Sequence, residues 1–114
     1  MHNHEDPEIY WNGKWTPICG HFFWDNDNGA KLFCQKLGLG NGKIKGEKQK
    51  GSKLTEDAIR IGQCSDSDNQ LFGCTGGCNE LKVGGHCKEG SICTKGQSAK
   101  VQIECGMLTV LLAF

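Results

Sequence analysis

The stretch WDNDNGAKLFCQKLGLG, residues 24–40, decides how this chain of 114 residues folds. Four side chains suited to a core recur there at positions i, i+3, i+4 and i+7, which predicts a helix with one buried stripe: Ala30, Phe33, Cys34 and Leu37. An Asp or Asn in Asp25-Asn26-Asp27 can cap the first turn, and Gly38 can end the helix in a left-handed conformation. Cys34 therefore lies on the inner face of the predicted helix, where a disulfide could pin that helix to a strand.

Cysteine is the most informative residue type in the rest of the chain. There are eight, at Cys19, Cys34, Cys64, Cys74, Cys78, Cys87, Cys93 and Cys105. Small secreted domains use cysteine at this density because cross-links replace part of a core that they are too small to build. Only 37% of the residues are hydrophobic and 17 are glycine, which suits a loop-rich fold. We therefore expect a single disulfide-stabilised domain outside the cytosol.

Charge is balanced overall but uneven along the chain. Thirteen basic and thirteen acidic residues give a formal net charge of zero, so no net attraction to nucleic acid is indicated. Five lysines nevertheless lie close together with only Glu47 opposing them: Lys43, Lys45, Lys48, Lys50 and Lys53. They are the leading candidate for binding sulfated glycans, lipopolysaccharide or another polyanion. The alternative is a solvated loop whose lysines only keep the protein soluble. Bidentate hydrogen bonding to an anion needs arginine, and Arg60 is the one arginine in the sequence.

Strand signals flank the predicted helix on both sides. The pattern around Asn12-Gly13 predicts a hairpin of residues 9–11 and 14–16, and Pro17 predicts an edge or a break near its second strand. Five aromatic residues surround the first cysteine and are expected to pack in the core, with one ring of Phe22-Phe23 exposed to a partner: Trp11, Trp15, Phe22, Phe23 and Trp24. Further strands are expected at residues 58–61 and 100–104, and loops at 40–53 and 75–98.

Metal and catalytic motifs are incomplete. Residues 25–29 are similar to the start of an EF-hand loop, but Lys36 occupies the twelfth position, where a carboxylate is required. The spacing of Cys74, Cys78, His86-Cys87 and Cys93 does not match the common zinc pairs. Oxidised cysteines leave no thiol nucleophile. We therefore expect no metal, no cofactor and no enzymatic activity.

Several segments together resemble the scavenger receptor cysteine-rich (SRCR) domain. They are EIYWNGKWTPIC at 8–19, the helical stretch at 24–40, CSDSDNQLFGC at 64–74 and AKVQIEC at 99–105, so that the resemblance runs from about residue 8 to residue 105. It implies a small α+β domain in which a curved antiparallel sheet cradles one main helix, with long loops.

The resemblance also implies disulfide pairings for six family cysteines plus one extra pair. Cys34–Cys105 would tie the helix to the last strand, and Cys64–Cys74 would close a small loop. Cys19 would pair with the cysteine before the last strand, a place for which this chain has three candidates. We favour Cys19–Cys93 with an additional Cys78–Cys87 bridge. The alternative is Cys19–Cys87 with Cys78–Cys93.

One family property does not carry over. Many members bind Ca²⁺ or Mg²⁺ through two aspartates directly after the first cysteine and a third acid before the last strand. Here the first pair is Gly20-His21, and the other stretch, residues 96–99, contains no acid. The resemblance therefore implies no cation site in this chain.

Three segments are expected: a flexible N-terminal tail at 1–7, the SRCR-like domain at 8–106 and an apolar C-terminal segment at 107–114. The last is too short to span a bilayer and is interpreted as a closing strand, a truncated anchor or a self-association strand. No signal peptide is visible, so either a leader has been removed, which we favour, or the chain is not secreted.

The expected function is non-enzymatic ligand binding by a secreted protein or a cell-surface ectodomain. The partner would be a protein or a polyanionic microbial or glycan surface, as in innate immunity, with no specific nucleic acid and membrane contact only through a missing anchor. The alternatives are a disulfide-stapled spacer within a larger extracellular protein and, more weakly, an intracellular zinc-binding domain.

Overall fold

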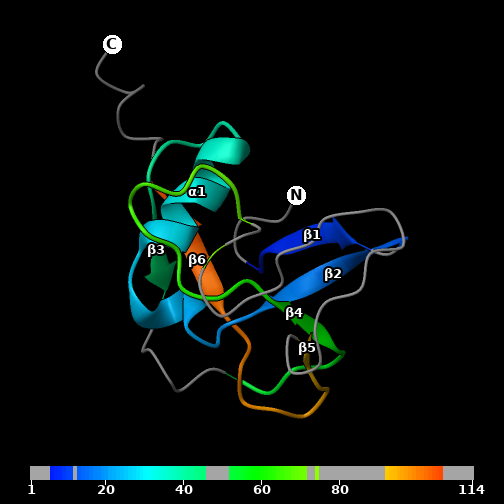
Figure 1. Cartoon of the computed structure of the whole chain (residues 1–114). Coiled ribbons are helices and arrows are strands. Elements are labelled where there is room, and N and C mark those ends of the chain that lie inside the picture. The colour runs from blue at the N-terminus through cyan, green and yellow to red at the C-terminus, as the bar shows by residue number, and fades with distance from the viewer. Residues whose placement is uncertain (1–5, 12, 46–51, 72–73, 75–91, 107–114) are drawn as a thin grey trace.

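The computed structural model describes residues 6–11, 13–45, 52–71, 74 and 92–106. Its elements in chain order are β1 (Glu8–Trp11), β2 (Lys14–Cys19), the 3-10 helix η1 (Phe23–Asp25), α1 (Asn28–Lys36), β3 (Gly42–Lys45), β4 (Ala58–Arg60), β5 (Ile92–Cys93) and β6 (Gln102–Cys105) (Figure 1). Among the described residues this is a small α+β domain with one α-helix, as the sequence predicts.

The predicted hairpin is present as β1 and β2, which pair antiparallel from Glu8↔Pro17 to Trp11↔Lys14. Pro17 does not break the second strand, which continues to Cys19. The Ile18 N–H donates to the Pro7 carbonyl at 3.2 Å, so the nitrogen of Pro17 faces away from β1. On that other side β4 pairs with β2 only from Ile18 onward. The missing N–H of Pro17 therefore costs no ladder hydrogen bond.

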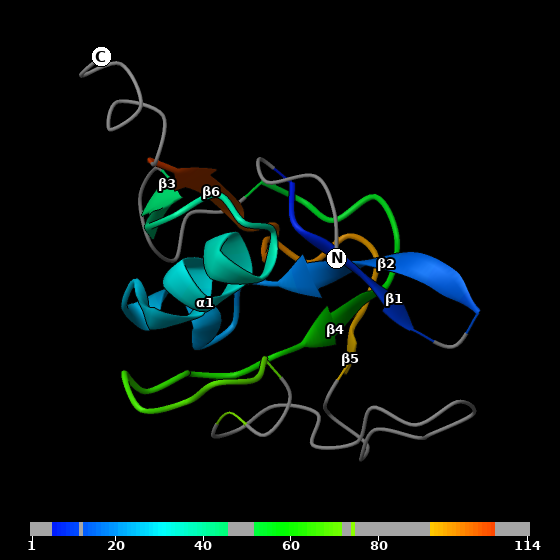
Figure 2. The ribbon, with the colours of Figure 1, turned by 90° about the horizontal axis from the view of Figure 1, so that it is seen from above.

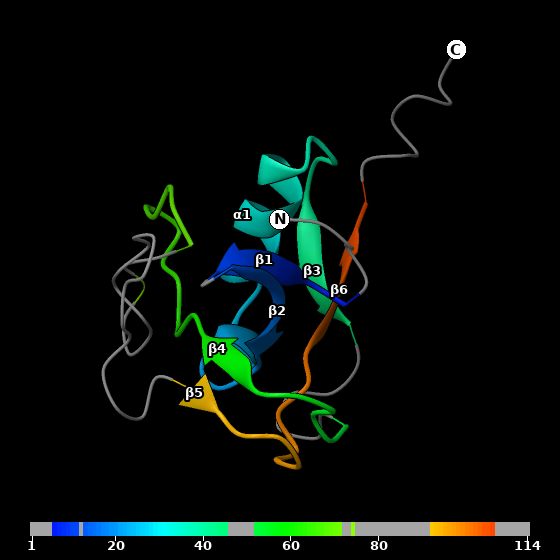
Figure 3. The same ribbon diagram turned by 90° about the vertical axis from the view of Figure 1, so that its right-hand side faces the viewer.

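The strands form two sheets instead of one antiparallel sheet, which corrects the sequence-based expectation. One sheet has the order β1-β2-β4-β5, and the other pairs β3 with β6. Strands β2 and β4 are parallel, with Ile18 opposite Ile59. Helix α1 and strand β3 lie between β2 and β4 in the chain (Figure 3). Helix α1 packs against β3 and β6 (Figure 2).

Two strands lie where loops were predicted. Strand β3 falls within residues 40–53 and pairs with β6 from Gly42↔Cys105 to Lys45↔Gln102. Strand β5 falls within residues 75–98 and pairs with β4. Neither segment is long enough to show a clear alternation of apolar and polar residues. They are strands because of their long-range pairing. The last strand begins at Gln102, and Lys100 before it forms an isolated bridge with Cys19.

The helix ends as predicted. Gly38 has φ 75°, its N–H donates to the Gln35 carbonyl at 3.0 Å, and the Leu39 N–H donates to the Cys34 carbonyl at 2.9 Å. These two bonds form a Schellman motif. Ala30, Phe33 and Cys34 of the predicted stripe are fully buried. Leu37, its fourth member, is partly buried at the edge of the core.

Capping at the start of α1 is only partly as predicted. The Asn26 side-chain oxygen accepts the Asn28 N–H at 2.9 Å, whereas Asp27, at the N-cap position, makes no side-chain cap bond. The Asp27 carboxylate accepts the Ile44 N–H at 2.9 Å instead. It therefore ties the first turn of the helix to β3.

Three disulfides connect the described elements, and they are the pairings that the family resemblance implies. Cys19–Cys93 links β2 to β5 across a sequence separation of 74, and Cys34–Cys105 links α1 to β6 across 71. Cys64–Cys74 closes a short loop with a separation of 10. The fourth expected bridge, Cys78–Cys87, lies outside the described residues.

Removing the long-range bridge should destabilise the domain more than removing the short one. In the chain-entropy model the double variant Cys34→Ala/Cys105→Ala loses about 4 kcal/mol, and Cys64→Ala/Cys74→Ala about 3 kcal/mol. Denaturant unfolding at matched pH measures both. Equal stability of the Cys34/Cys105 variant and the wild type would show that this bridge does not hold the fold.

A methyl group at Gly42 should also be costly. A Cβ there would overlap the Ala30 carbonyl and the Cys34 sulfur, so α1 and β3 would have to separate. We expect Gly42→Ala to lower the free energy of unfolding by about 1–3 kcal/mol. Gly106→Ala is the matched control, because nothing lies within 4 Å of its Cβ, and it should change stability by less than about 0.5 kcal/mol. Similar thermal midpoints for the two variants would contradict the close helix–strand contact.

Candidate ligand-binding surface

The described members of the lysine cluster lie on a strand and beside it, and do not form one loop. Lys43 and Lys45 occupy alternate positions of β3, so they share one face of the strand, and both are exposed. Lys53 is exposed and precedes the buried Leu54. Lys48 and Lys50 lie outside the described residues. The sequence therefore assigned the first part of the lysine cluster to the wrong kind of structure, and ligand binding by the cluster stays a prediction.

Lys43 of the lysine cluster is paired with a carboxylate. Lys43 stands opposite Glu104 in the β3–β6 register, and its Nζ lies 3.0 Å from Glu104 Oε1. Both side chains are largely exposed and line an open hollow of about 400 Å³ at the end of this sheet. An exposed ion pair contributes little to stability, but Glu104 offsets the charge that Lys43 presents to an anion.

Lys100 lies near Lys53 in the fold, a proximity that the sequence does not reveal. The Lys100 N–H donates to the Ser52 carbonyl at 3.0 Å, and Leu54 exchanges backbone hydrogen bonds with Gly96 and Gln97, both at 2.9 Å. Residues 52–54 thus run beside residues 96–100 and bring Lys53 near Lys100. Lys100 Nζ also lies 3.6 Å from Asp6 Oδ1. Only the folded arrangement brings these segments together, so no local sequence signal could have found Lys100.

The two segments that the family uses for a divalent cation do lie side by side in this structure. The Gly20 N–H donates to the Ala99 carbonyl at 2.6 Å. Residues 20–21 and 96–99 nevertheless contain no carboxylate, and hard cations such as Ca²⁺ need several oxygen ligands with negative charge. The residues present here do not fit the family's cation.

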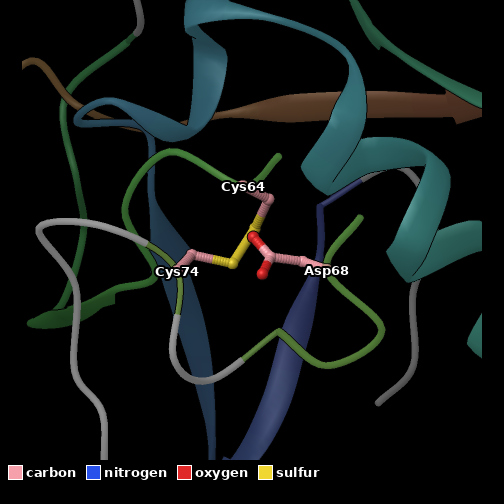
Figure 4. Close-up of side chains that lie close together, drawn as sticks. All are labelled: Cys64, Asp68 and Cys74. Atoms are coloured by element: carbon pink, nitrogen blue, oxygen red, sulfur yellow. A yellow bond between two sulfur atoms is a disulfide. The ribbon is translucent and has the colours of Figure 1, made fainter. Parts of the chain in front are cut away.

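A second group of potential metal ligands is also unsuited to that role. Atoms of Cys64, Asp68 and Cys74 lie within 4.8 Å of one another, but Figure 4 shows the two sulfurs joined in a disulfide beside the Asp68 carboxylate. Cysteine binds zinc as the thiolate, which an oxidised pair cannot supply. Asp68 instead accepts the Ser65 N–H at 2.8 Å. The weaker zinc hypothesis is wrong for Cys74 and Cys93, because both are in disulfides.

The aromatic group divides between core and surface. Phe23 and Trp24 are buried, whereas the Phe22 ring is 47% exposed, so the prediction that one of the adjacent phenylalanine rings is exposed is confirmed. Core packing is wrong for Trp15, which is 38% exposed. Trp15 lies directly opposite Tyr10 on the outer face of the hairpin, where their rings pack edge to face with centroids 5.5 Å apart.

The arrangement of these elements is similar to the fold of a known SRCR domain. The chain is similar to the crystal structure of the dimeric form of the SRCR domain of mouse MARCO, with a TM-score of 0.51 and 23% sequence identity over 91% of this chain and 87% of that one. No family model matches the chain, and no curated protein sequence is detectably similar to it. The structural likeness establishes the fold. Among the described residues, no helix has the length and apolar character needed to cross a bilayer.

Neutralising Glu104 should strengthen the attraction of this surface for polyanions. In Glu104→Gln the Lys43 ammonium loses its carboxylate partner at 3.0 Å while the side-chain shape is kept. We expect the variant to elute from immobilised heparin at higher salt than the wild type. Glu56→Gln is the matched control for net charge. Glu56 pairs with Lys14, outside the lysine cluster, and the Lys14 Nζ lies 3.9 Å from Glu56 Oε1. Equal elution of the two variants would mean that Lys43 does not face the anion.

Proposed function

We propose that this protein is an extracellular, non-enzymatic ligand-binding module of scavenger-receptor type that binds polyanionic surfaces. The observation that carries the proposal is the basic surface itself. Lys43 and Lys45 project from one face of β3, and Lys53 and Lys100 lie on two segments joined by backbone hydrogen bonds. A rigid, disulfide-linked framework therefore presents several ammonium groups from different parts of the chain.

The physical basis of binding would be electrostatic. Each ammonium that meets a sulfate or phosphate group releases a condensed counterion, so several weak contacts add up and the affinity falls steeply with salt. Lysine is a compact point charge with no preferred ligand geometry, which suits recognition of charge density more than of one defined molecule. Sulfated glycans and microbial envelope polymers are ligands of this kind.

The sulfur chemistry supports placement outside the cell. Cys19–Cys93, Cys34–Cys105 and Cys64–Cys74 are structural bridges, and such bridges persist in oxidising compartments. The same oxidation removes these sulfurs as nucleophiles, which favours binding over catalysis.

The alternative is a structural spacer without a ligand of its own. It is favoured by the pairing of Lys43 with Glu104 and of Lys100 with Asp6, because both pairs lower the charge that this surface offers to a ligand. A ligand-binding module requires lysines at these particular positions to bind a polyanion, whereas a spacer does not. Binding to heparin measures this difference.

Charge reversal of the described lysine cluster should weaken binding to heparin. We expect Lys43→Glu/Lys45→Glu/Lys53→Glu to elute at clearly lower salt, with a shallower dependence of log affinity on log salt because fewer counterions are released. The matched control, Lys14→Glu/Lys31→Glu/Lys36→Glu, changes the net charge equally on exposed side chains of β2 and α1. Identical retention of the two triple variants would reject the basic surface and favour the spacer.

A further inference from the structure

Phe22 has a backbone conformation that side-chain-bearing residues seldom adopt. Its φ is 63° and its ψ is −26°, and among the described residues it is the one non-glycine with positive φ. Glycine or asparagine would relieve this strain. The ring is 47% exposed, so its burial does not compensate for the strained backbone. Strained residues of this kind concentrate at ligand-binding and switch sites.

The surrounding structure fixes this conformation from both sides. The Gly20 N–H donates to the Ala99 carbonyl at 2.6 Å, and the Trp24 N–H donates to the Gly20 carbonyl at 3.0 Å. Phe23 and Trp24 are buried directly after Phe22, and Gly20 lies so close to the Trp24 ring that a Cβ would overlap it. The backbone at Phe22 is therefore held in this conformation.

Arg60 completes the arrangement. It stands opposite Cys19 in the β2–β4 register, and its Cζ lies over the Phe22 ring at 5.9 Å from the centroid, within cation–π range. The His21 ring lies at the edge of the same phenylalanine, with centroids 5.5 Å apart. The Arg60 Nε is buried and, within the described part of the chain, has no hydrogen-bond partner. A buried donor without an acceptor is costly.

From these contacts we propose that Arg60 and Phe22 form a subsite for an anionic sugar residue. The Arg60 guanidinium binds the sulfate ester or carboxylate through charge-assisted hydrogen bonds, for which its planar fork of donors is suited. The exposed surface of the Phe22 ring packs against the apolar C–H face of the sugar. This subsite deepens the proposed polyanion binding and rests on it, since it adds a shaped contact to an otherwise diffuse basic surface.

A sugar fits this site better than a protein partner does. Stable protein interfaces bury about 800 Å² on each partner and anchor their central side chains in pockets. Here the features are one half-exposed ring and one guanidinium, a contact the size of a single pyranose with its charged substituent.

The subsite is tested with a single sulfated sugar, a ligand far smaller than heparin. Titrating ¹⁵N-labelled protein with N-acetylglucosamine 6-sulfate should give saturable shifts of the Arg60 Nε–H and Phe22 backbone N–H signals at millimolar concentration. Unsulfated N-acetylglucosamine should shift them far less. If neither signal responds to the sulfated sugar, the subsite does not exist.

Variants separate recognition from folding. Phe22→Asn relieves the strained backbone and should raise the melting temperature or leave it unchanged, while weakening binding of the sulfated sugar at least about fivefold. Arg60→Lys keeps the charge but removes the planar fork and should weaken binding similarly. Tyr10→Ser, at another exposed aromatic residue, is the control and should bind as the wild type does. Wild-type affinity in Phe22→Asn and Arg60→Lys would overturn the proposal.

The same titration distinguishes the two proposals. If the lysine triple variant retains the monosaccharide response while heparin retention proves insensitive to lysine position, the basic surface is rejected and the subsite stands. If heparin retention depends on the lysines but Arg60 and Phe22 do not respond to the sulfated sugar, only the subsite is rejected.

Discussion

The Cys34–Cys105 disulfide is the constraint on which the arrangement of the domain depends. Cys34 lies on the buried face of α1, and Cys105 ends β6, so the bridge fixes the helix to the sheet across most of the chain. Strand β3 meets the same point, because Gly42 is opposite Cys105 in register and has no side chain to displace the Cys34 sulfur. Helix, β3 and β6 therefore converge on one pair of sulfurs, and the Asp27 carboxylate adds a second link from the helix to β3.

Because the disulfide holds the helix and the sheet together, other segments can present exposed side chains at the surface. The segment after β2 can keep Phe22 in a strained conformation because Phe23 and Trp24 anchor it in the core. The segments at 52–54 and 96–100 pair through backbone hydrogen bonds. This pairing positions Lys53 and Lys100, and neither side chain is part of the core. In a domain with a small core, covalent links supply the rigidity that the proposed binding surface would need.

The sequence predicted the parts of this fold that are encoded locally. Helix α1 has a periodic apolar stripe and a glycine with the required left-handed conformation, and the hairpin has its Asn-Gly turn. Strand β3 was missed because Ile44 stands alone between two lysines, and β6 decides its pairing. The parallel β2–β4 pair was missed for a similar reason, since it depends on the path of the intervening chain. The exposed ring of Phe22-Phe23 was foreseen, but its contact with Arg60 joins residues that no local pattern connects.

The fold depends on these cysteines being oxidised in the native protein and paired as they are in this structure. The most direct measurement is a peptide map of protein purified under non-reducing conditions with free thiols blocked at lysis, analysed by mass spectrometry. The account predicts linked peptides for Cys19–Cys93, Cys34–Cys105 and Cys64–Cys74 and no blocked thiol at any of these six positions. Blocked thiols at Cys34 and Cys105, or a different partner for either, would contradict the fold and its extracellular placement together.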